Sequence, residues 1–447
     1  MKNILIVGGN AAGPAAAAKA KRTDKNANVI LIEASPFIST GTCEMPFILG
    51  GKIDNYKKVV FFDEQSFYEK KGVKVYAKHK VEDINPKAKT VYVRNLETDE
   101  TLEFEYDKLI LTTGSIPKTI PALAKGYDNL FHLKSIPDLI KISDFVKKQN
   151  PKSALVIGAG YIGLETAEAF RALGMEVTVV ELEELPLPGA EPEIRNLAKE
   201  ELKENGVRFF GGIPYEFLFI DNRIKGIKIE GRILEFDIVL TAIGVKPNTE
   251  LALKAGLELG KFGGIKVDSK QKTSDWNIFA AGDNTEIINA VTNKPDYFPI
   301  ATIAYNQSHV AGANAAGGNE YSLPVVTNIA VKIFGKNYAS VGLTEAKAKE
   351  HFSDVHSVTA IGLNIIKVMP GSEKVFGKLV FEKNTKRILG ASFWGAKQSA
   401  QYADVISALI RAKAEYGILS QIDFNYTPPL SPFVNILSIL GKKAKDV

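Results

Sequence analysis

Two segments of this chain repeat one pattern: a strand, a glycine-rich turn, an alanine-rich helix, a second strand and an acidic residue. The first segment runs from Asn3 to Ser35 and the second from Ser153 to Glu184. Their apolar runs, ILIV and ALVI, are short and continuous, which is typical of strands buried in a parallel sheet. The alanine-rich stretches favour helix. The pattern predicts an α/β fold with two Rossmann-like nucleotide-binding domains.

The second turn carries a complete GxGxxG, spanning Gly158, Gly160, Tyr161, Ile162 and Gly163. The first glycine makes the turn, the second lets backbone approach a pyrophosphate, and the third lets the helix pack on the strand. Oriented N–H groups at the helix start favour phosphate. Glu181 ends the next strand, where it can hydrogen-bond both ribose hydroxyls and would repel a 2′-phosphate. We therefore expect NADH here, with NADPH less favoured.

The first turn is less regular, with Asn10 where the middle glycine belongs. Asn tolerates unusual backbone angles better than most residues, so we expect the turn to survive. Glu33 follows the next strand, as Glu181 does in the second segment. Two such segments suggest two nucleotides that face each other, an arrangement in which a nicotinamide can pass hydride to a flavin. The candidate binding residues of this turn are Gly8, Gly9, Asn10, Ala11, Ala12 and Gly13.

The totals exclude several classes of protein. The chain has 447 residues, 45% apolar and 24% charged, with a net charge of +5 and one cysteine. It has room for about three domains. A disulfide framework, a cysteine-rich metal site and an HExxH site are all excluded, and no metal is expected. No apolar run reaches about 18 residues, the start shows no signal-peptide plan, and the charge gives little support to a nucleic-acid partner. We expect a cytoplasmic protein.

The last third changes character near Asn328. Strands such as NIAVKIFG and ILGASFWG flank helix candidates at Thr344–His351 and Ala400–Ala414, which predicts an α+β domain. The tail FVNILSILGKKAKDV is weakly amphipathic, and we expect it to pack as a helix instead of lying on a membrane.

Several motifs in order resemble the FAD-dependent pyridine nucleotide-disulfide oxidoreductases over nearly the whole chain. LILTTGSIP at Leu109–Pro117 and TAIGVKPNT at Thr241–Thr249 look like the family's two crossings between its FAD and NAD regions, and NIFAAGDNTE resembles its second FAD motif. The resemblance implies that Asp283 binds the ribityl chain and that Tyr161 and Glu165 form an aromatic lid and an acid near the flavin ring. It also implies cofactor contacts from Thr112, Thr113, Gly114, Gly244, Gly282 and Ala301.

The same resemblance implies a domain order. Residues 1–118 and 246–326 would form the FAD-binding domain, 119–245 the NAD(P)H-binding domain, and 327–447 a C-terminal dimerisation domain.

STGTCEMPFILGG, which contains the lone Cys43, points to one branch of that family. The two-cysteine members carry CxxxxC and a C-terminal catalytic histidine, but Ile48 stands at the second position here and no histidine follows His356. The segment resembles the single-cysteine branch of coenzyme A-disulfide reductases, persulfide reductases, NADH oxidases and NADH peroxidases. The matching residues are Ser39, Cys43, Pro46, Phe47 and Gly50. Tyr426 lies in a YTPP that resembles the YxPP of the first two groups, where the tyrosine reaches the partner subunit; this implies a homodimer.

A lone cysteine is more often a buried hydrophobe than a catalytic group, but the position of Cys43 favours catalysis. It precedes Glu44 and Pro46, and proline favours a first helical turn. We expect the helix start to lower the pKa of the thiol, unless Glu44 points at the sulfur. Cys43 would then cycle through a mixed disulfide with a small thiol, and Tyr426 would protonate the leaving thiolate.

The substrate stays open between several classes. Lys19, Lys21 and Arg22 lie near the end of the first Rossmann helix, where coenzyme A-disulfide reductases have basic residues facing coenzyme A phosphates; a solvated helix end explains them equally well. Ser39 and Asn306 are further substrate-binding candidates. Coenzyme A disulfide or a persulfide is the first expectation. The alternatives are an NADH oxidase or peroxidase that uses a cysteine sulfenic acid, which the absence of an acid–base group at Asn10 disfavours, and a flavin-bearing redox sensor or electron-transfer protein.

Overall fold

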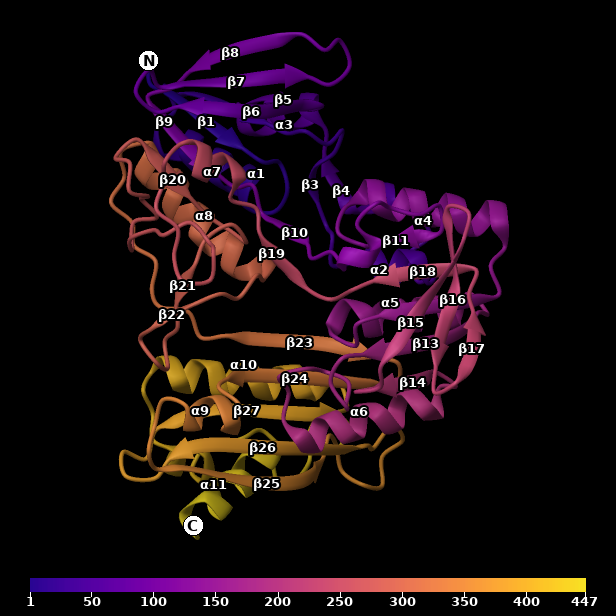
Figure 1. Cartoon of the computed structure of the whole chain (residues 1–447). Helices are drawn as coiled ribbons and strands as arrows, with labels where there is room; N and C mark the ends of the chain where they lie inside the picture. The colour runs from indigo at the N-terminus through magenta and orange to yellow at the C-terminus, as the bar shows by residue number, and fades with distance from the viewer.

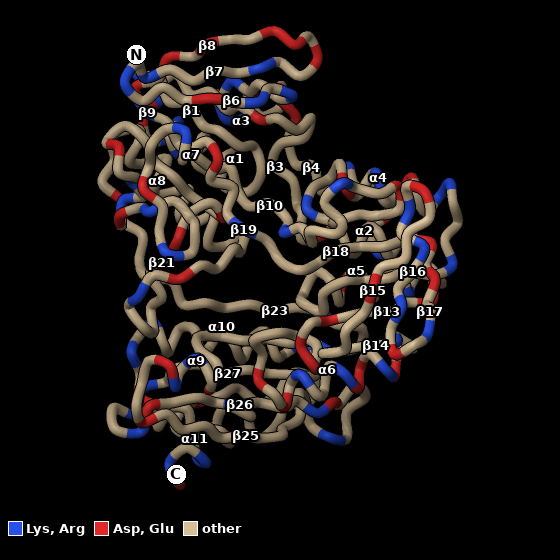
Figure 2. The backbone as a smooth tube through the Cα atoms, viewed as in Figure 1, with Lys and Arg blue, Asp and Glu red and all other residues tan.

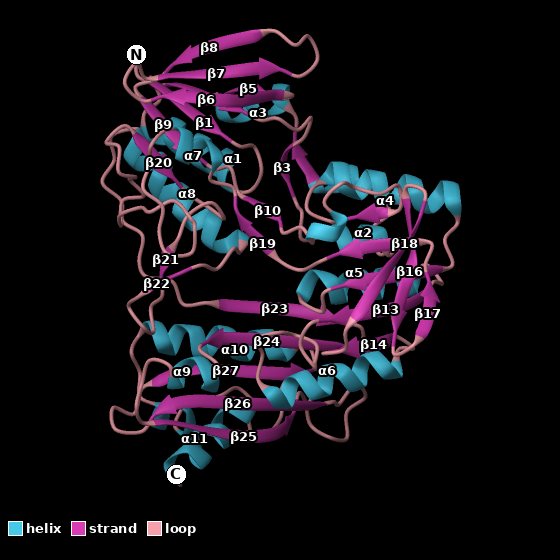
Figure 3. Ribbon diagram, viewed as in Figure 1, coloured by secondary structure: helices cyan, strands magenta, loops and turns pink.

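Three five-stranded sheets organise the chain in a computed structural model that describes residues 1–447. Two sheets are parallel and covered by helices, and the third is antiparallel (Figures 1 and 3). This arrangement confirms the predicted fold class. The domain borders drawn at residues 118, 245 and 326 stay predictions.

The first sheet has the strand order β20-β9-β1-β2-β5. Strand β20 comes from far along the chain yet pairs with β9, and helix α8 packs against α1 in the same way (Figure 1). The segment after residue 246 therefore returns to the first unit. The elements of this unit are β1 (Asn3–Val7), α1 (Ala12–Thr23), β2 (Asn28–Ile32), β3 (Ile38–Thr40), α2 (Met45–Leu49), η1 (Tyr56–Val59), β4 (Val60–Phe62), α3 (Glu64–Lys71), β5 (Lys74–Tyr76), β6 (His79–Asn85), β7 (Thr90–Asn95), β8 (Thr101–Glu105), β9 (Lys108–Leu111), α7 (Glu250–Lys254), β20 (Ile278–Ala280), β21 (Ile287–Ile288), β22 (Pro295–Asp296) and α8 (Ala301–Ala315).

The second sheet has the order β11-β18-β12-β13-β14 and holds the second repeat. A two-stranded ribbon, β10 with β19, carries the chain out of the first unit and back. The elements are β10 (Ser115–Pro117), η2 (Pro121–Leu123), β11 (Leu130–Phe131), α4 (Ile136–Gln149), β12 (Ser153–Ile157), α5 (Tyr161–Ala172), β13 (Glu176–Glu181), α6 (Pro192–Glu204), β14 (Arg208–Gly211), β15 (Tyr215–Ile220), β16 (Arg223–Ile229), β17 (Arg232–Glu235), β18 (Ile238–Thr241) and β19 (Val245–Pro247).

The third sheet is antiparallel, in the order β23-β24-β27-β26-β25. One face packs on α10 and α11; the other shares a core with the second unit, in which Val331, Tyr338 and Trp394 meet Leu164 and Phe170. The elements are β23 (Asn328–Ile333), β24 (Lys336–Gly342), α9 (Glu345–Lys349), β25 (Val355–Leu363), β26 (Lys374–Glu382), β27 (Ile388–Gly395), α10 (Gln398–Arg411), η3 (Tyr416–Ser420) and α11 (Ile436–Lys445).

The tail forms the packed helix that its pattern predicts. Ile436, Leu437 and Leu440 of α11 are fully buried in the core of the third sheet. None of the helices combines the length and the apolar character needed to cross a bilayer. Acidic and basic residues are interspersed over the whole backbone trace instead of gathering on one element (Figure 2).

Candidate active site

The first glycine-rich turn is held by close backbone contacts. Gly8 has a φ of 107°, and a Cβ on Gly13 would lie 1.7 Å from the carbonyl oxygen of Gly8, so only glycine fits there. The carboxylate of Glu33 accepts hydrogen bonds from the N–H groups of Gly9 and Ser35. Burial raises the pKa of Glu33. The carboxylate of Glu33 therefore lies against the turn, where the ribose of a bound nucleotide is expected.

The turn forms with Asn10 in it, as expected, but not for the expected reason. Asn10 has a φ that is not positive, so its tolerance of unusual backbone angles is not used. Its side-chain oxygen instead accepts a hydrogen bond from the hydroxyl of Thr40 at 2.8 Å. Asn10 thus joins the turn to the strand that leads to Cys43.

The second turn repeats the first. Gly158 has a φ of 101°, and a Cβ on Gly163 would lie 2.0 Å from the carbonyl oxygen of Gly158. Glu181 accepts hydrogen bonds from the N–H groups of Ala159 and Leu182, each at 2.7 Å. Gly160, just before α5, faces open space, which leaves room for a pyrophosphate against the helix start. Tyr161 and Ile162 follow in the first turn of α5, the tyrosine half-buried and the isoleucine exposed.

Between the two turns, the remaining cofactor candidates line one region. Asp283 accepts hydrogen bonds from Ser115 Oγ at 2.8 Å and Lys134 Nζ at 3.3 Å. The neighbouring Asn284 is fully buried, yet its side-chain oxygen has no partner. A buried polar atom without a partner is costly and indicates a ligand or water. These residues fit the ribityl and ring edge of a flavin.

The other candidates of that region have mainly backbone roles. The hydroxyl of Thr112 donates to the carbonyls of Val7 and Gly8, and that of Thr113 to Asn248. Gly114, Gly244 and Gly282 all adopt positive φ, which only glycine takes readily. Ala301 opens α8, which begins without a side-chain cap, so its first N–H groups are free to meet a ligand.

Cys43 lies on an exposed loop just before α2, and Pro46 stands in the first turn of that helix as predicted. The expected lowering of its pKa is wrong. Partial burial of the thiol raises its pKa, and so do the carboxylates of Glu44, Glu165 and Asp283; only Lys134 lowers it. A five-residue helix has too small a dipole to offset three carboxylates.

Lys134 was not among the predicted site residues. It pairs with Asp283, and its charge reaches Cys43. It directly precedes Ser135, which caps α4 through a capping box with Asp138. A capping box marks a helix start. Because helix starts line this edge of the second sheet, the motif could have identified the cation beside it.

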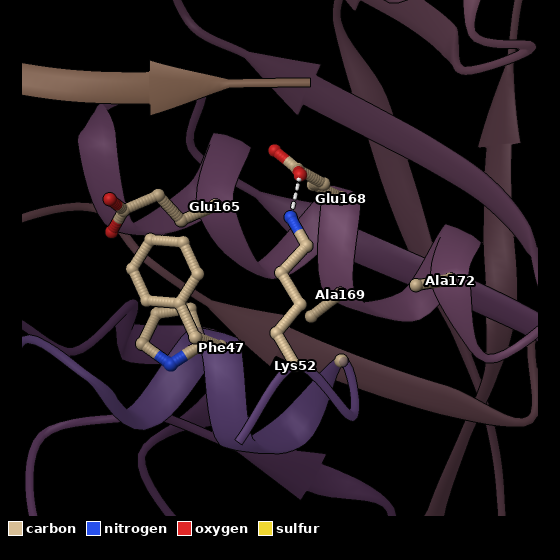
Figure 4. Close-up of a pocket in the computed structure, with 8 residues that line it drawn as sticks. Phe47, Lys52, Glu165, Glu168, Ala169 and Ala172 are labelled. Carbon is tan, nitrogen blue, oxygen red and sulfur yellow. Dashed lines mark hydrogen bonds and ion pairs between the residues drawn. The ribbon is translucent and has the colours of Figure 1, made fainter. Parts of the chain in front are cut away.

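Helices α2 and α5 meet around a small pocket (Figure 4). Phe47 comes from α2, and Glu165 lies next to it from α5. Burial, and then the charge of Glu168, raise the pKa of Glu165 to about 7. Tyr161, one turn before Glu165, has a raised pKa because it is buried beside Tyr338. Glu165 can therefore hold or release a proton near neutral pH, close to the thiol.

The predicted substrate residues do not all converge. Lys19 pairs with Glu320 at 2.6 Å, whereas Lys21 donates to the carbonyl of Ala27 at 2.7 Å and lies over Gly72. Partial burial lowers the pKa of His309 on α8. The nearby charges of Arg22 and Lys19 lower it further.

Asn306, on the same helix α8, lines a cavity of about 1040 Å³ between the first and third units. Ser39 has a φ of 50° and donates its N–H to Gly9 at 2.7 Å, so its backbone belongs to the first turn. Tyr426 lies on an exposed loop, with its ring edge-on to Phe433 at 5.4 Å between centroids.

Comparisons with known proteins agree with this geometry. An NADH oxidase of Methanocaldococcus jannaschii is 28% identical over 441 residues, covering 98% of both chains. A coenzyme A disulfide reductase of Staphylococcus haemolyticus is 28% identical over 455 residues, covering 100% of both. The structure of an NAD-dependent persulfide reductase from A. fulgidus superimposes with a TM-score of 0.95 at 32% identity, covering 99% of this chain and 83% of that one.

Two family models match nearly the whole chain. The model described as pyridine nucleotide-disulphide oxidoreductase matches residues 2–307, and the model of the dimerisation domain of the same family matches residues 329–436. The chain belongs to the pyridine nucleotide-disulphide oxidoreductase family.

Proposed function

We propose that this protein reduces coenzyme A disulfide, or a related small disulfide or persulfide, with NADH as the electron donor, FAD as the carrier and Cys43 as the only redox-active thiol. The observation that carries the proposal is the position of Cys43. It lies between the two nucleotide-binding units, close enough to Glu165 of the second unit and Asp283 of the first for both carboxylates to raise its pKa.

Each unit would hold one cofactor. Glu33, the turn Gly8–Gly13 and Asp283 would hold FAD, and Glu181 with the turn Gly158–Gly163 would hold NADH. FAD, when bound, takes a hydride from the nicotinamide and passes two electrons to sulfur. Glu181 accepts hydrogen bonds from three backbone N–H groups, and its carboxylate would stand where NADPH brings a phosphate. This supports NADH over NADPH.

Cys43 would alternate between a mixed disulfide and a thiolate. A mixed disulfide between Cys43 and a small thiol takes two electrons and one proton, which releases the small thiol and leaves the Cys43 thiolate. That thiolate attacks the next disulfide, so the mixed disulfide forms again and the second thiolate leaves. The sum is NADH, one proton and one disulfide giving NAD⁺ and two thiols. Lys134 favours the thiolate form of Cys43, and Glu165 can supply the proton.

The leaving thiolate would take its proton from Tyr426 of a second copy, because we infer a homodimer. The match to a dimerisation-domain model supports this. So does the loop itself, which exposes Tyr426, Leu430, Phe433 and Val434 within ten residues. A cluster of exposed apolar side chains of this kind is typical of an interface.

Coenzyme A is the favoured thiol because α1 ends in cations that lie beside α8. Lys19 and Arg22 on α1, together with Asn306 on the adjoining α8, could bind its phosphates and adenosine. The relative from S. haemolyticus is named a coenzyme A disulfide reductase, which agrees. Lys21 donates to the carbonyl of Ala27 and Lys19 pairs with Glu320, so both ammonium groups would have to leave these partners to bind a phosphate.

The test is NADH consumption by the FAD-loaded protein under argon, with and without coenzyme A disulfide. We expect steady turnover that needs the disulfide and is lost in Cys43→Ser. A single bleaching of the flavin followed by no turnover would instead indicate a redox sensor.

An NADH oxidase is the second candidate, favoured by the M. jannaschii relative of that name. It would use a sulfenic acid at Cys43. Asn10 disfavours the oxidase candidate, because a side-chain amide cannot act as the acid or base at that position. NADH consumption that needs oxygen and ignores the disulfide would support this candidate over the first.

A further inference from the structure

Glu168 of α5 forms a junction between all three units of the chain. Its side chain is only 14% exposed, and its carboxylate makes three contacts. Lys52, from the segment after α2, lies 2.5 Å from Oε1 (Figure 4). Lys332 of β23 lies 3.2 Å from the same oxygen, and the N–H of Phe334 donates to Oε2 at 2.6 Å. One carboxylate thus ties the first and third units to the nucleotide-binding helix.

The contact with Lys52 fixes the helix that follows Cys43. Lys52 also lies over the ring of Phe47, 5.6 Å from its centroid. On the same surface, a Cβ on Gly50 would lie 3.1 Å from Cα of Ala169, so α2 rests directly on α5. The ion pair held by the half-buried carboxylate of Glu168 adds a directional contact to this close packing of α2 on α5.

We propose that Glu168 is a positioning residue, which holds α2, the helix that follows Cys43, in register with the nucleotide-binding helix α5 and the β23–β24 turn. The predicted effect of Glu168 on catalysis rests on the proposed function. Its contacts with Lys52, Lys332 and Phe334 do not. Glu168 lies two helical turns beyond Tyr161, so it acts on the relation between the thiol and the nucleotide without touching the nucleotide turn.

The charges at the junction couple Glu168 to the ionisation of Cys43. A contact with a purely structural role would not change the pH dependence of the thiol. Glu165 shares its pocket with Glu168 of its own helix and with Lys52 from the segment after α2. Tyr161 precedes Glu165 by one helical turn, and the charge of Glu165 reaches Cys43 in the loop before α2. Lys332 of β23 contacts the carboxylate of Glu168. The negative charge of Glu168 contributes to the raised pKa of Glu165, and ionised Glu165 in turn raises the pKa of Cys43. Glu44, Asp283 and Lys134 act on the thiol directly.

The first experiment follows alkylation of reduced Cys43 by iodoacetamide across pH, in wild type, Glu168→Gln and Lys52→Met. Thiolate is the reactive form, so the wild-type profile should carry a component near pH 7 from ionisation of Glu165. In Glu168→Gln this component should move to lower pH, because the neighbouring carboxylate that helps to raise the pKa of Glu165 is gone. In Lys52→Met it should move to higher pH.

The second experiment separates kcat from KM. Displacement of α2 should lower kcat in Glu168→Gln by at least about tenfold, with KM for NADH changed less than twofold. The double variant Glu168→Gln/Lys52→Met should lose no more than the worse single variant, since both single variants break the same Glu168–Lys52 pair. Lys58→Met, which removes only the exposed pair with Asp54, is the control and should match wild type in both experiments.

An alkylation profile that keeps its component near pH 7 in both variants would overturn the proposal, as would an unchanged kcat in Glu168→Gln. The alkylation needs neither NADH nor a disulfide. Failure of the proposed function would therefore appear as absent turnover in wild type, with the alkylation shifts intact.

Discussion

The carbonyl oxygen of Gly158 occupies the place that a side chain on Gly163 would need, 2.0 Å from the position of its Cβ. The equivalent distance between Gly13 and Gly8 is 1.7 Å. Both nucleotide-binding turns therefore depend on a glycine one helical turn after the tight turn. This shared geometry allows the two units to be disabled one at a time.

Gly163→Ala should push α5 away from β12 and spoil the second turn only. We expect KM for NADH to rise by about tenfold or more, since strain of this kind costs about 1–3 kcal/mol. The FAD content per chain, measured from the flavin absorbance, should stay at the wild-type level. Gly13→Ala should do the reverse and lose FAD. Loss of FAD from Gly163→Ala would contradict the assignment of the two units.

Glu181→Ser should relax the choice of nucleotide. Removal of the carboxylate abolishes the repulsion of a 2′-phosphate and leaves a hydroxyl in its place. We expect the ratio of kcat/KM for NADPH to that for NADH to rise by about tenfold, which corresponds to about 1.4 kcal/mol. Glu176→Ser, at the far end of the same strand, serves as the control. An unchanged ratio would remove Glu181 from the ribose site.

Lys134→Met should raise the pKa of Cys43, because Lys134 is the one group found to lower it. Glu44→Gln should lower that pKa, since its charge acts in the opposite direction. Thiolate absorbance across pH in the reduced protein measures both. Lys147→Met, near the other end of α4, should leave the titration in place. Movement of the two pKa values in the same direction would show that the charges do not reach the thiol.

Lys378 provides a stability test. It is 4% exposed, and its ammonium lies within 3.1 Å of carboxylate oxygens of Glu191, Glu193 and Glu345, which join α6 to the third unit. Lys378→Met leaves the buried carboxylate of Glu191 without its cation, so we expect a loss of about 3–5 kcal/mol in the free energy of unfolding. Lys349→Met removes only the exposed pair with Glu345 and should cost about 1 kcal/mol or less. Equal losses, measured by denaturant unfolding, would contradict this account.

The same cluster predicts a response to acid. The pKa of Glu345 is lowered to about 2 by its hydrogen bond to Lys349 and its contacts with Lys378 and Ser357. A lowered folded-state pKa stabilises the fold above the ordinary value of 4.5, and this contribution is lost as the pH falls toward about 2. Wild type should therefore lose stability over this interval more steeply than Glu345→Gln. Parallel curves would show that Glu345 does not contribute.

The repeats made most of the fold predictable. A glycine-rich turn between buried strands has few alternative structures, and both repeats formed the expected sheet, turn and acid at Glu33 and Glu181. The C-terminal sheet followed from its strand pattern, and α11 from its apolar face.

The electrostatics of the site could not be predicted in the same way. The position of Cys43 before α2 was correct. Its pKa, however, is raised first by burial and by the adjacent Glu44, and is then altered by Glu165, Lys134 and Asp283, which are far away in the chain and meet only in the fold. The junction at Glu168 is of the same kind. Its partners Lys52 and Phe334 lie 116 and 166 residues away, so no local motif could pair them.

The central claim is that Cys43 alternates between a thiolate and a mixed disulfide with a small thiol. Intact mass of the native protein before and after dithiothreitol tests it most directly. We predict loss of an adduct of the mass of coenzyme A, its return on addition of coenzyme A disulfide, and its absence in Cys43→Ser. An unmodified thiol, or one carrying only added oxygen, that does not respond to coenzyme A disulfide would contradict it.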